Sequence, residues 1–142
     1  MENKVLELDF LRKQYPWATE EQLNVIKLGL EKDIDVSIYA NRKFNESQMF
    51  VIYNGLKENL NVKVYASPKF NSLQMEIIYW GLRDNMNVEI YVNPKFSFDQ
   101  MYQIYIGLKK NLNVKIYAFY QIPDFIMKKI VLQLEKTISK GF

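Results

Sequence analysis

Tyrosines recur at regular intervals in this chain, and they are among its side chains best suited to bind a ligand. One series comprises Tyr39, Tyr65, Tyr91 and Tyr117, and a second comprises Tyr53, Tyr79 and Tyr105. Such rings could stack on the bases or sugars of a nucleic acid. Because they keep register with isoleucines and leucines of a buried stripe, we expect core or inter-repeat contacts, with the hydroxyls at a wet edge.

Two rows of cations accompany the tyrosines. The loop row lies on predicted loops and comprises Arg42, Lys43, Lys69 and Lys95. The second row lies near predicted helix ends and comprises Lys57, Arg83 and Lys109. Cations on neighbouring repeats could follow phosphates, so nucleic-acid binding by the loop row is an alternative function. The helix dipole already favours cations at helix ends, and the net charge is only +3. We therefore expect protein as the first class of partner and nucleic acid as the second.

Catalytic and metal-binding chemistry finds little support in the sequence. The 142 residues include no cysteine and no histidine, which excludes thiol nucleophiles, histidine-based triads and structural zinc. The carboxylates Glu76, Asp99, Asp124 and Glu135 do not recur as a pair on one predictable face, and no phosphate-binding glycine loop or calcium loop is visible. We expect a non-enzymatic protein with no catalytic residue, no metal and no cofactor.

The ends and the hydropathy of the chain bear on its location. Met1 to Phe10 has neither a basic region nor an apolar core of the kind that signal peptides carry. The longest apolar runs are far shorter than the ~20 residues that span a bilayer. We expect a cytoplasmic protein with no membrane partner.

The chain is an internal repeat, and this repeat must position every side chain discussed above. Gly29, Gly55, Gly81 and Gly107 are 26 residues apart, and each is followed by leucine. Glutamine and isoleucine recur in the same register at Gln22, Gln48, Gln74 and Gln100, and at Ile26, Ile52, Ile78 and Ile104. Such a period is typical of solenoids. It predicts repeats at 19–44, 45–70, 71–96 and 97–122, between an N-terminal cap at 1–18 with an opening helix at 2–14 and a C-terminal cap helix at 123–142.

Each repeat opens with signals for the start of a helix. Thr19, Asn45, Asn71 and Ser97 each precede glutamine by three residues, which is the spacing of a capping box. Apolar residues follow at helical spacing, as in Met49, Ile52 and Leu56. Asn59, Asn85 and Asn111 can adopt the left-handed conformation that ends helices, so we expect the helices to end near residues 58, 84 and 110.

The second element of each repeat is harder to assign. Asp35, Asn61, Asn87 and Asn113 precede a Val-x-(Ile/Val)-Tyr segment and could cap a helix of about two turns, which Pro68 or Pro94 would end. Valine and isoleucine two residues apart would also suit a short strand. We expect the helix because the repeat offers no partner strand. The fold class is therefore all-α: one domain, a small right-handed α-solenoid of four helix-turn-helix repeats with capping helices at both ends.

The recurrent glycine of the first helix is costly, since glycine within a helix is about 1 kcal/mol less favourable than alanine. Gly55 lies on the flank of the buried stripe defined by Ile52. We expect the missing side chain to let the backbone of the next repeat approach closely. Contact of these glycines with a ligand is the alternative.

The positions that vary between repeats indicate a binding surface. On the face of the first helix away from the buried stripe, large apolar residues alternate with acids and amides, which is the composition of protein-binding surfaces. Tryptophan is enriched among interface hot spots, so we expect Trp80 to anchor a partner. Packing of this face against the short second helices is the alternative. The candidate protein-binding residues are Leu28, Phe50, Asn54, Leu73, Glu76, Trp80, Asp99, Tyr102 and Ile106.

The pattern Gln48-Met49-x-x-Ile52-x-x-Gly55-Leu56, with Asn61-Val62-x-x-Tyr65-Ala66 and Pro68-Lys69-Phe70, resembles a short helical repeat of phages, mobile elements and low-GC Gram-positive bacteria. The resemblance covers about residues 19–122. It implies a scaffold and no particular reaction. By analogy, a small repeat protein of a mobile element would inhibit a bacterial immune complex, as anti-CRISPR proteins do, and a host nuclease complex would be its partner. A homo-oligomeric scaffold, in the simplest case a homodimer, is a further alternative.

Overall fold

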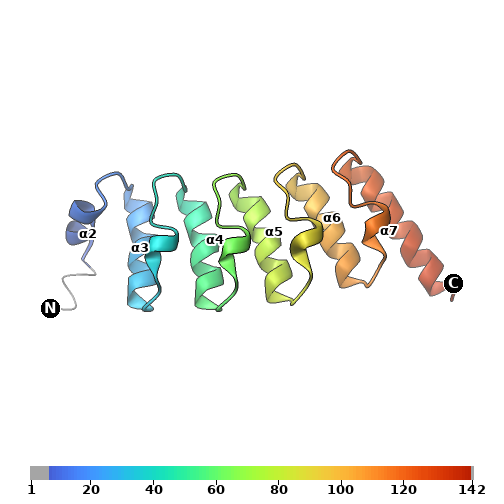
Figure 1. The fold of residues 1–142 in the computed structure, drawn as a ribbon, viewed down its shortest axis with the longest axis horizontal. Coiled ribbons are helices and arrows are strands. Elements are labelled where there is room, and N and C mark those ends of the chain that lie inside the picture. The colour runs from blue at the N-terminus through green and yellow to red at the C-terminus, as the bar shows by residue number, and fades with distance from the viewer. Residues whose placement is uncertain (1–6, 142) are drawn as a thin grey trace. The chain divides into compact units, whose positions relative to one another are not determined.

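The computed structural model describes residues 7–141, and within that range the chain is all-helical and has no strand. Figure 1 shows long α-helices that alternate with single turns of 3₁₀ helix. The α-helices are α2 (Leu8–Gln14), α3 (Glu20–Glu31), α4 (Glu46–Lys57), α5 (Ser72–Arg83), α6 (Phe98–Lys109) and α7 (Asp124–Ser139). The 3₁₀ helices are η1 (Val36–Ile38), η2 (Val62–Val64), η3 (Val88–Ile90) and η4 (Val114–Ile116). The expected all-α, solenoid-like repeat is confirmed.

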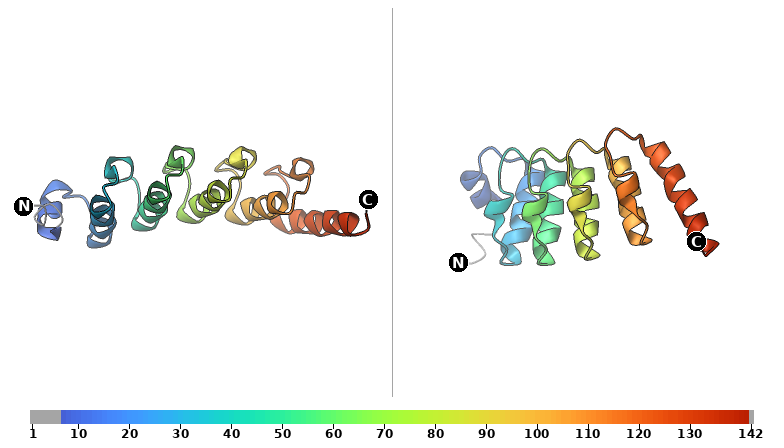
Figure 2. Two further views of the ribbon diagram at one scale, coloured as in Figure 1. Left: turned by 90° about the horizontal axis from the view of Figure 1, so that it is seen from below. Right: turned by 45° about the vertical axis from the view of Figure 1, so that its right-hand side comes forward.

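The chain divides into two compact units, one ending at Met75 and the other beginning at Glu76. The first unit contains α2, α3 and α4, and the second contains most of α5 with α6 and α7. In each unit the α-helices lie in one layer and the 3₁₀ turns lie on one side of that layer (Figure 2). The single domain over residues 1–142 and the right-handed sense of the solenoid stay predictions. Of the opening helix expected at 2–14, residues 2–6 lie outside the described part of the chain, and α2 is the remainder.

The helix starts follow the sequence signals closely. Asn45 accepts a hydrogen bond from the backbone N–H of Gln48 at 2.8 Å, and the Gln48 side chain accepts one from the Asn45 N–H, also at 2.8 Å. The same reciprocal pair forms at Thr19, Asn71 and Ser97. Each box satisfies two backbone donors that the first turn of a helix leaves without partners. The four predicted capping boxes are confirmed.

The helix ends are equally local in origin. Asp33, Asn59, Asn85 and Asn111 have φ angles of 55–58°, in the left-handed region where asparagine and aspartate are tolerated best. After Asn59 the chain turns back, and the N–H of Leu60 donates to the carbonyl of Gly55 at 2.8 Å. This is the long-range bond of a Schellman motif, and it ends α4 at Lys57 with Glu58 as the C-cap, close to the expected end at residue 58.

The second element of each repeat is a single 3₁₀ turn, so the expected two-turn helix is wrong, and so is its strand alternative. In η2 only Val62–Val64 are helical, and Tyr65 leaves the helix with φ −127° and ψ −5°. Valine on both sides of Lys63 disfavours helix, since β-branched side chains lose rotamer freedom there. The turn ends at Tyr65 because that side chain is fully buried and its hydroxyl donates to the carbonyl of Val51, at 2.8 Å, back in α4.

The recurrent tyrosine explains the recurrent glycine. A methyl group at Gly55 would lie 2.5 Å from Cγ1 of Val62 and closer still to the hydroxyl of Tyr65. Gly29, Gly81 and Gly107 face the tyrosine and valine of their own repeats in the same way. The glycine is therefore needed for close packing, as expected, but its neighbour is the 3₁₀ turn of the same repeat and not the backbone of the next repeat. The hydroxyls expected at a wet edge are buried in this tyrosine series.

The recurrent glutamine joins one repeat to the next. Gln48 is buried, and its Nε2 donates to the carbonyl of Phe70 at 2.7 Å, immediately before the cap of the following helix. Gln22 makes the corresponding bond to Phe44, and Gln100 makes it to Ile122. One side chain thus fixes the start of its own helix and the position of the next. The isoleucines of the stripe, Ile26, Ile52, Ile78 and Ile104, have no exposed surface, as the repeat pattern predicts.

Candidate protein-binding surface

The variable positions of the first helices occupy one face, which we call the outer face. In α6 it includes Asp99, Tyr102 and Ile106. Gly107 packs against η4, and Tyr102, five residues earlier, lies about 140° around the helix from it, at 100° per residue. Tyr102 therefore points away from the 3₁₀ turn η4, whereas Asp99 and Ile106, about 80° and 100° from Gly107, lie on the flank of the helix. Figure 2 shows that the 3₁₀ turns of a unit lie on one side of its α-helices. Leu28, Phe50, Leu73 and Tyr102 are exposed, so the alternative that this face packs against the short second elements does not hold for these four side chains.

In the first unit the outer face exposes large apolar side chains. Phe50 is 43% exposed and Leu73 is 53% exposed, and Leu28 is also exposed. Asn54 is half-buried beside them. The ring of Phe50 lies 5.8 Å from that of Tyr53, which is almost fully buried. A partner could therefore cover Phe50 without rearrangement of the core beneath it.

In the second unit the outer face carries a cluster of four aromatic rings. Trp80 lies 5.9 Å from Tyr105, Tyr105 lies 6.4 Å from Tyr102, and Tyr102 stacks on Phe98 at 6.2 Å. Tyr102 is exposed, whereas Trp80, Glu76 and Ile106 are half-buried and Asp99 is exposed. Trp80 therefore offers only part of its ring to a partner, and its role as an anchor stays a prediction.

One hydrogen bond holds this cluster to the end of α5. The hydroxyl of Tyr105 donates to Oδ2 of Asp84 at 2.6 Å. Burial of the ring, together with the bond to this carboxylate, raises the pKa of Tyr105 to about 12. The hydroxyl consequently stays protonated over the physiological range and acts as a fixed donor. Nothing in this arrangement activates the phenol as a base.

A groove between α6 and α7 continues the outer face of the second unit. It measures about 310 Å³, and Tyr102, Ile106, Val131 and Leu132 form its apolar walls. The remaining lining residues are polar: Gln103, Lys110, Lys128 and Glu135. The Lys110 ammonium pairs with the Glu135 carboxylate across the groove. Among the described side chains, Lys128 has no such partner, so the groove carries one uncompensated positive charge.

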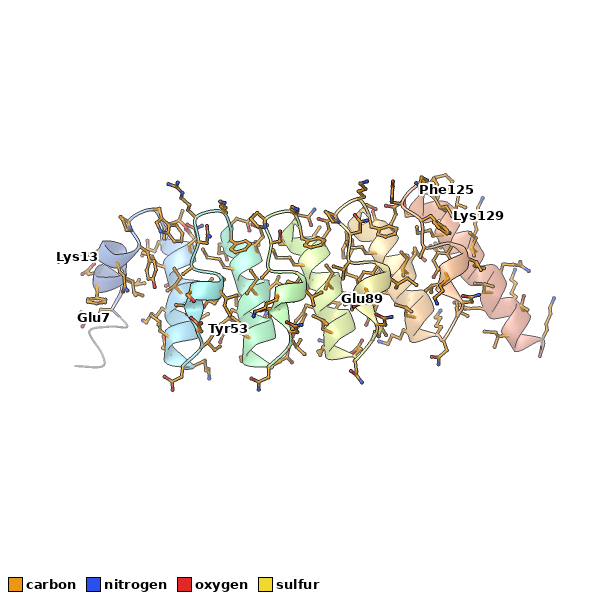
Figure 3. All side chains as sticks on the ribbon, in the orientation of Figure 1. Glu7, Lys13, Tyr53, Glu89, Phe125 and Lys129 are labelled. Carbon is orange, nitrogen blue, oxygen red and sulfur yellow. The ribbon has the colours of Figure 1, made fainter. Side chains whose placement is uncertain are left out.

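Sequence analysis missed the α7 wall of this groove, although the signal was present. The apolar residues Met127, Ile130 and Leu134 keep the 26-residue register in α7. Extending the variable positions by the same interval from Asp99, Tyr102 and Ile106 gives Phe125, Lys128 and Leu132. Phe125 is 59% exposed and Leu132 is 49% exposed. The outer face of the second unit therefore includes α7, whose first turns carry Phe125 and Lys129 (Figure 3).

The basic rows have different surroundings. The second row covers tyrosine rings, with Lys57 lying 5.4 Å from the centre of Tyr53 and Lys109 lying 5.7 Å from that of Tyr105. This contact gives the second row a structural role. In the loop row, Arg42, Lys43 and Lys69 of the first unit are exposed, and Lys95 of the second lies 5.0 Å from the ring centre of Tyr120. The loop row therefore stays available to an anion.

Among the residues that the structure describes, no group of three or more acidic side chains could hold a metal ion. No described helix is both long and apolar enough to cross a bilayer. The fold and the outer face together define the class as a helical-repeat protein with an exposed aromatic and aliphatic surface. No protein-family model, curated protein or solved structure matches the chain.

Proposed function

We propose that this chain is a non-enzymatic protein-binding module and that the outer face of its α-helices contacts the partner. The exposure of large apolar side chains at the positions that vary between repeats carries the proposal. A repeat needs its glutamine, glycine, isoleucine and tyrosine to fold, whereas Phe50 and Tyr102 contribute exposed surface at positions where the scaffold makes no such demand. Apolar surface of this kind stabilises a complex when a partner removes it from water.

The second unit supports the proposal most directly. Its aromatic cluster and the α6–α7 groove combine Tyr102 and Ile106 with a rim of charged groups. Aromatic and aliphatic anchors within a polar rim are the anatomy of protein interfaces. The resemblance noted above extends the proposal to inhibition of a bacterial immune complex, in which the module would cover a nuclease surface or hold an inactive conformation without chemistry of its own.

Site-specific photo-crosslinking tests the proposal. The full chain would carry a photoreactive phenylalanine at position 102 and be irradiated in lysate from a low-GC Gram-positive bacterium. Position 116 is the matched control, because Ile116 is 51% exposed but lies on η4. A protein crosslinked from position 102 and not from position 116 is the expected result. Equal labelling from both positions, or none from position 102, would contradict the use of the outer face.

Alanine substitutions then separate protein binding from nucleic-acid binding. With the captured partner, Phe50→Ala, Trp80→Ala and Tyr102→Ala should weaken binding at least ten-fold, and Ile116→Ala should leave it unchanged. Lys69→Ala and Lys95→Ala should have little effect. If binding instead falls steeply with salt and survives the aromatic substitutions, the loop row binds phosphates and the nucleic-acid alternative replaces the proposal.

A further inference from the structure

We propose that the groove between α6 and α7 binds an amphipathic helix of a partner protein and that this helix carries acidic residues. This inference rests on the protein-binding function proposed above and adds the chemistry of the partner. It concerns the second unit alone. Its basis is the shape of the groove, its apolar walls and the sign of its uncompensated charge.

The shape of the groove suits a helix. The walls come from two neighbouring helices, with Tyr102 and Ile106 one turn apart on α6, and Lys128 and Leu132 one turn apart on α7. An amphipathic helix laid along such a groove presents apolar side chains at the same one-turn interval. The twelve residues of α6 extend about 18 Å, so a partner helix of about three to four turns would fill the available length.

The charged residues around the groove indicate which sign of charge the partner helix should carry. Glu135, the acidic residue of the lining, is neutralised by Lys110. Lys128 makes no ion pair with a described side chain, although Asp124 stands one turn before it on α7. Exposed Lys136 lies two turns further along α7, about 12 Å away along the axis, so the two lysines outnumber this carboxylate. Leu132 is halfway between these two lysines. A matching helix would place an acidic residue near each lysine and apolar residues between them.

Two polar replacements in α7 support binding on the outer face rather than packing of a further repeat. The buried Val51 of α4 corresponds to exposed Lys129 in α7, and Gly55 corresponds to exposed Gln133. These polar replacements give α7 the polar side that is typical of a capping helix, at positions where earlier helices such as α4 are buried. Phe125 and Leu132 stay apolar at the variable positions, so α7 continues the outer face.

Selection from a peptide library tests the inference with the full chain. The library displays helices of about fourteen residues in which the positions of one face are randomised. The selected peptides should have aspartate or glutamate at two positions about two turns apart, with apolar residues between them. They should lose at least ten-fold in affinity for Lys128→Glu and for Leu132→Ala, measured by fluorescence anisotropy. The matched controls are Lys115→Glu and Ile116→Ala on η4, which change charge and apolar exposure equally and should bind as the unchanged chain does.

Each other outcome overturns the inference. The acidic helix is contradicted if the selected peptides are neutral or basic, or if they bind Lys128→Glu as well as they bind the unchanged chain. It is also contradicted if the library yields no binding peptide. Co-sedimentation with phosphatidylserine vesicles that Lys128→Glu abolishes would assign the same charges to a lipid surface. If a partner is still crosslinked at position 102 in any of these cases, the protein-binding function stands and only the partner chemistry fails.

Discussion

Gly55→Ala should destabilise this protein, although the same change in most helices stabilises them. Residue 55 lies in the last turn of α4, where alanine would improve helix propensity by about 1 kcal/mol. Its added methyl group would meet Cγ1 of Val62 at 2.5 Å and would overlap the hydroxyl of Tyr65. The hydroxyl must therefore leave the Val51 carbonyl, to which it donates at 2.8 Å.

The expected magnitude follows from three contributions. Overpacking of a filled core costs about 1–3 kcal/mol, and the lost hydrogen bond costs about 1 kcal/mol. The gain in helix propensity offsets about 1 kcal/mol of this total. The free energy of unfolding should therefore fall by about 1–3 kcal/mol, which lowers the urea midpoint by roughly 1 M for a typical dependence on urea.

Urea unfolding followed by circular dichroism measures this change. The control is Asn24→Ala, which adds alanine at an exposed position of α3 and should be neutral or slightly stabilising. Combining Gly55→Ala with Tyr65→Phe should cost at least about 1 kcal/mol less than the sum of the two single changes, since the second removes the displaced hydroxyl. A stabilising Gly55→Ala, or strict additivity of the pair, would refute the proposed contact between glycine and tyrosine.

Three further predictions follow from other contacts. Gln48→Glu keeps an acceptor for the capping box but loses the donor to the Phe70 carbonyl, so the free energy of unfolding at neutral pH should fall by about 2 kcal/mol. Part of this loss should be recovered in acid, because the protonated carboxyl can donate again. No recovery in acid would contradict the donor role of Gln48. Burial raises the pKa of Tyr39, Tyr91 and Tyr117 above the unfolded value of 10, so their contribution to stability is complete below pH 10. Above pH 10 the free energy of unfolding should fall by about 4 kcal/mol per pH unit, because three protons are lost on unfolding. A urea midpoint that stays constant above pH 10 would contradict the burial of these hydroxyls. Asp84→Asn should lower the pKa of Tyr105 from about 12, which ultraviolet titration against the Tyr105→Phe variant detects; an unchanged titration would exclude the carboxylate as a cause.

The outer face shows how far a repeated sequence can predict a site. Positions such as Phe50 and Tyr102 were identifiable because they vary while their neighbours recur, and both are exposed. Trp80 has the residue type of an anchor, but its ring packs on Tyr105, 5.9 Å away. A residue type does not determine how much of a side chain its neighbours cover. For Trp80, the neighbour that covers it lies 25 positions later in the chain.

The start and the end of each α-helix follow from residues that are close together in the chain. Capping boxes such as Asn45 with Gln48, and left-handed caps such as Asn59, join groups within a few residues of one another, so the local sequence contains both partners. The period of the repeat likewise determined that Ile52 and its counterparts are buried.

Features that join distant residues depend instead on how the helices pack in three dimensions. The bond from Tyr65 to Val51 spans 14 positions, and it limits the second element to one 3₁₀ turn and leaves no room for a side chain at residue 55. The ion pair of Lys110 with Glu135 spans 25 positions and leaves Lys128 as the uncompensated charge of the groove. Such contacts depend on how helices pack, and packing arises from the whole set of buried side chains rather than from any short segment.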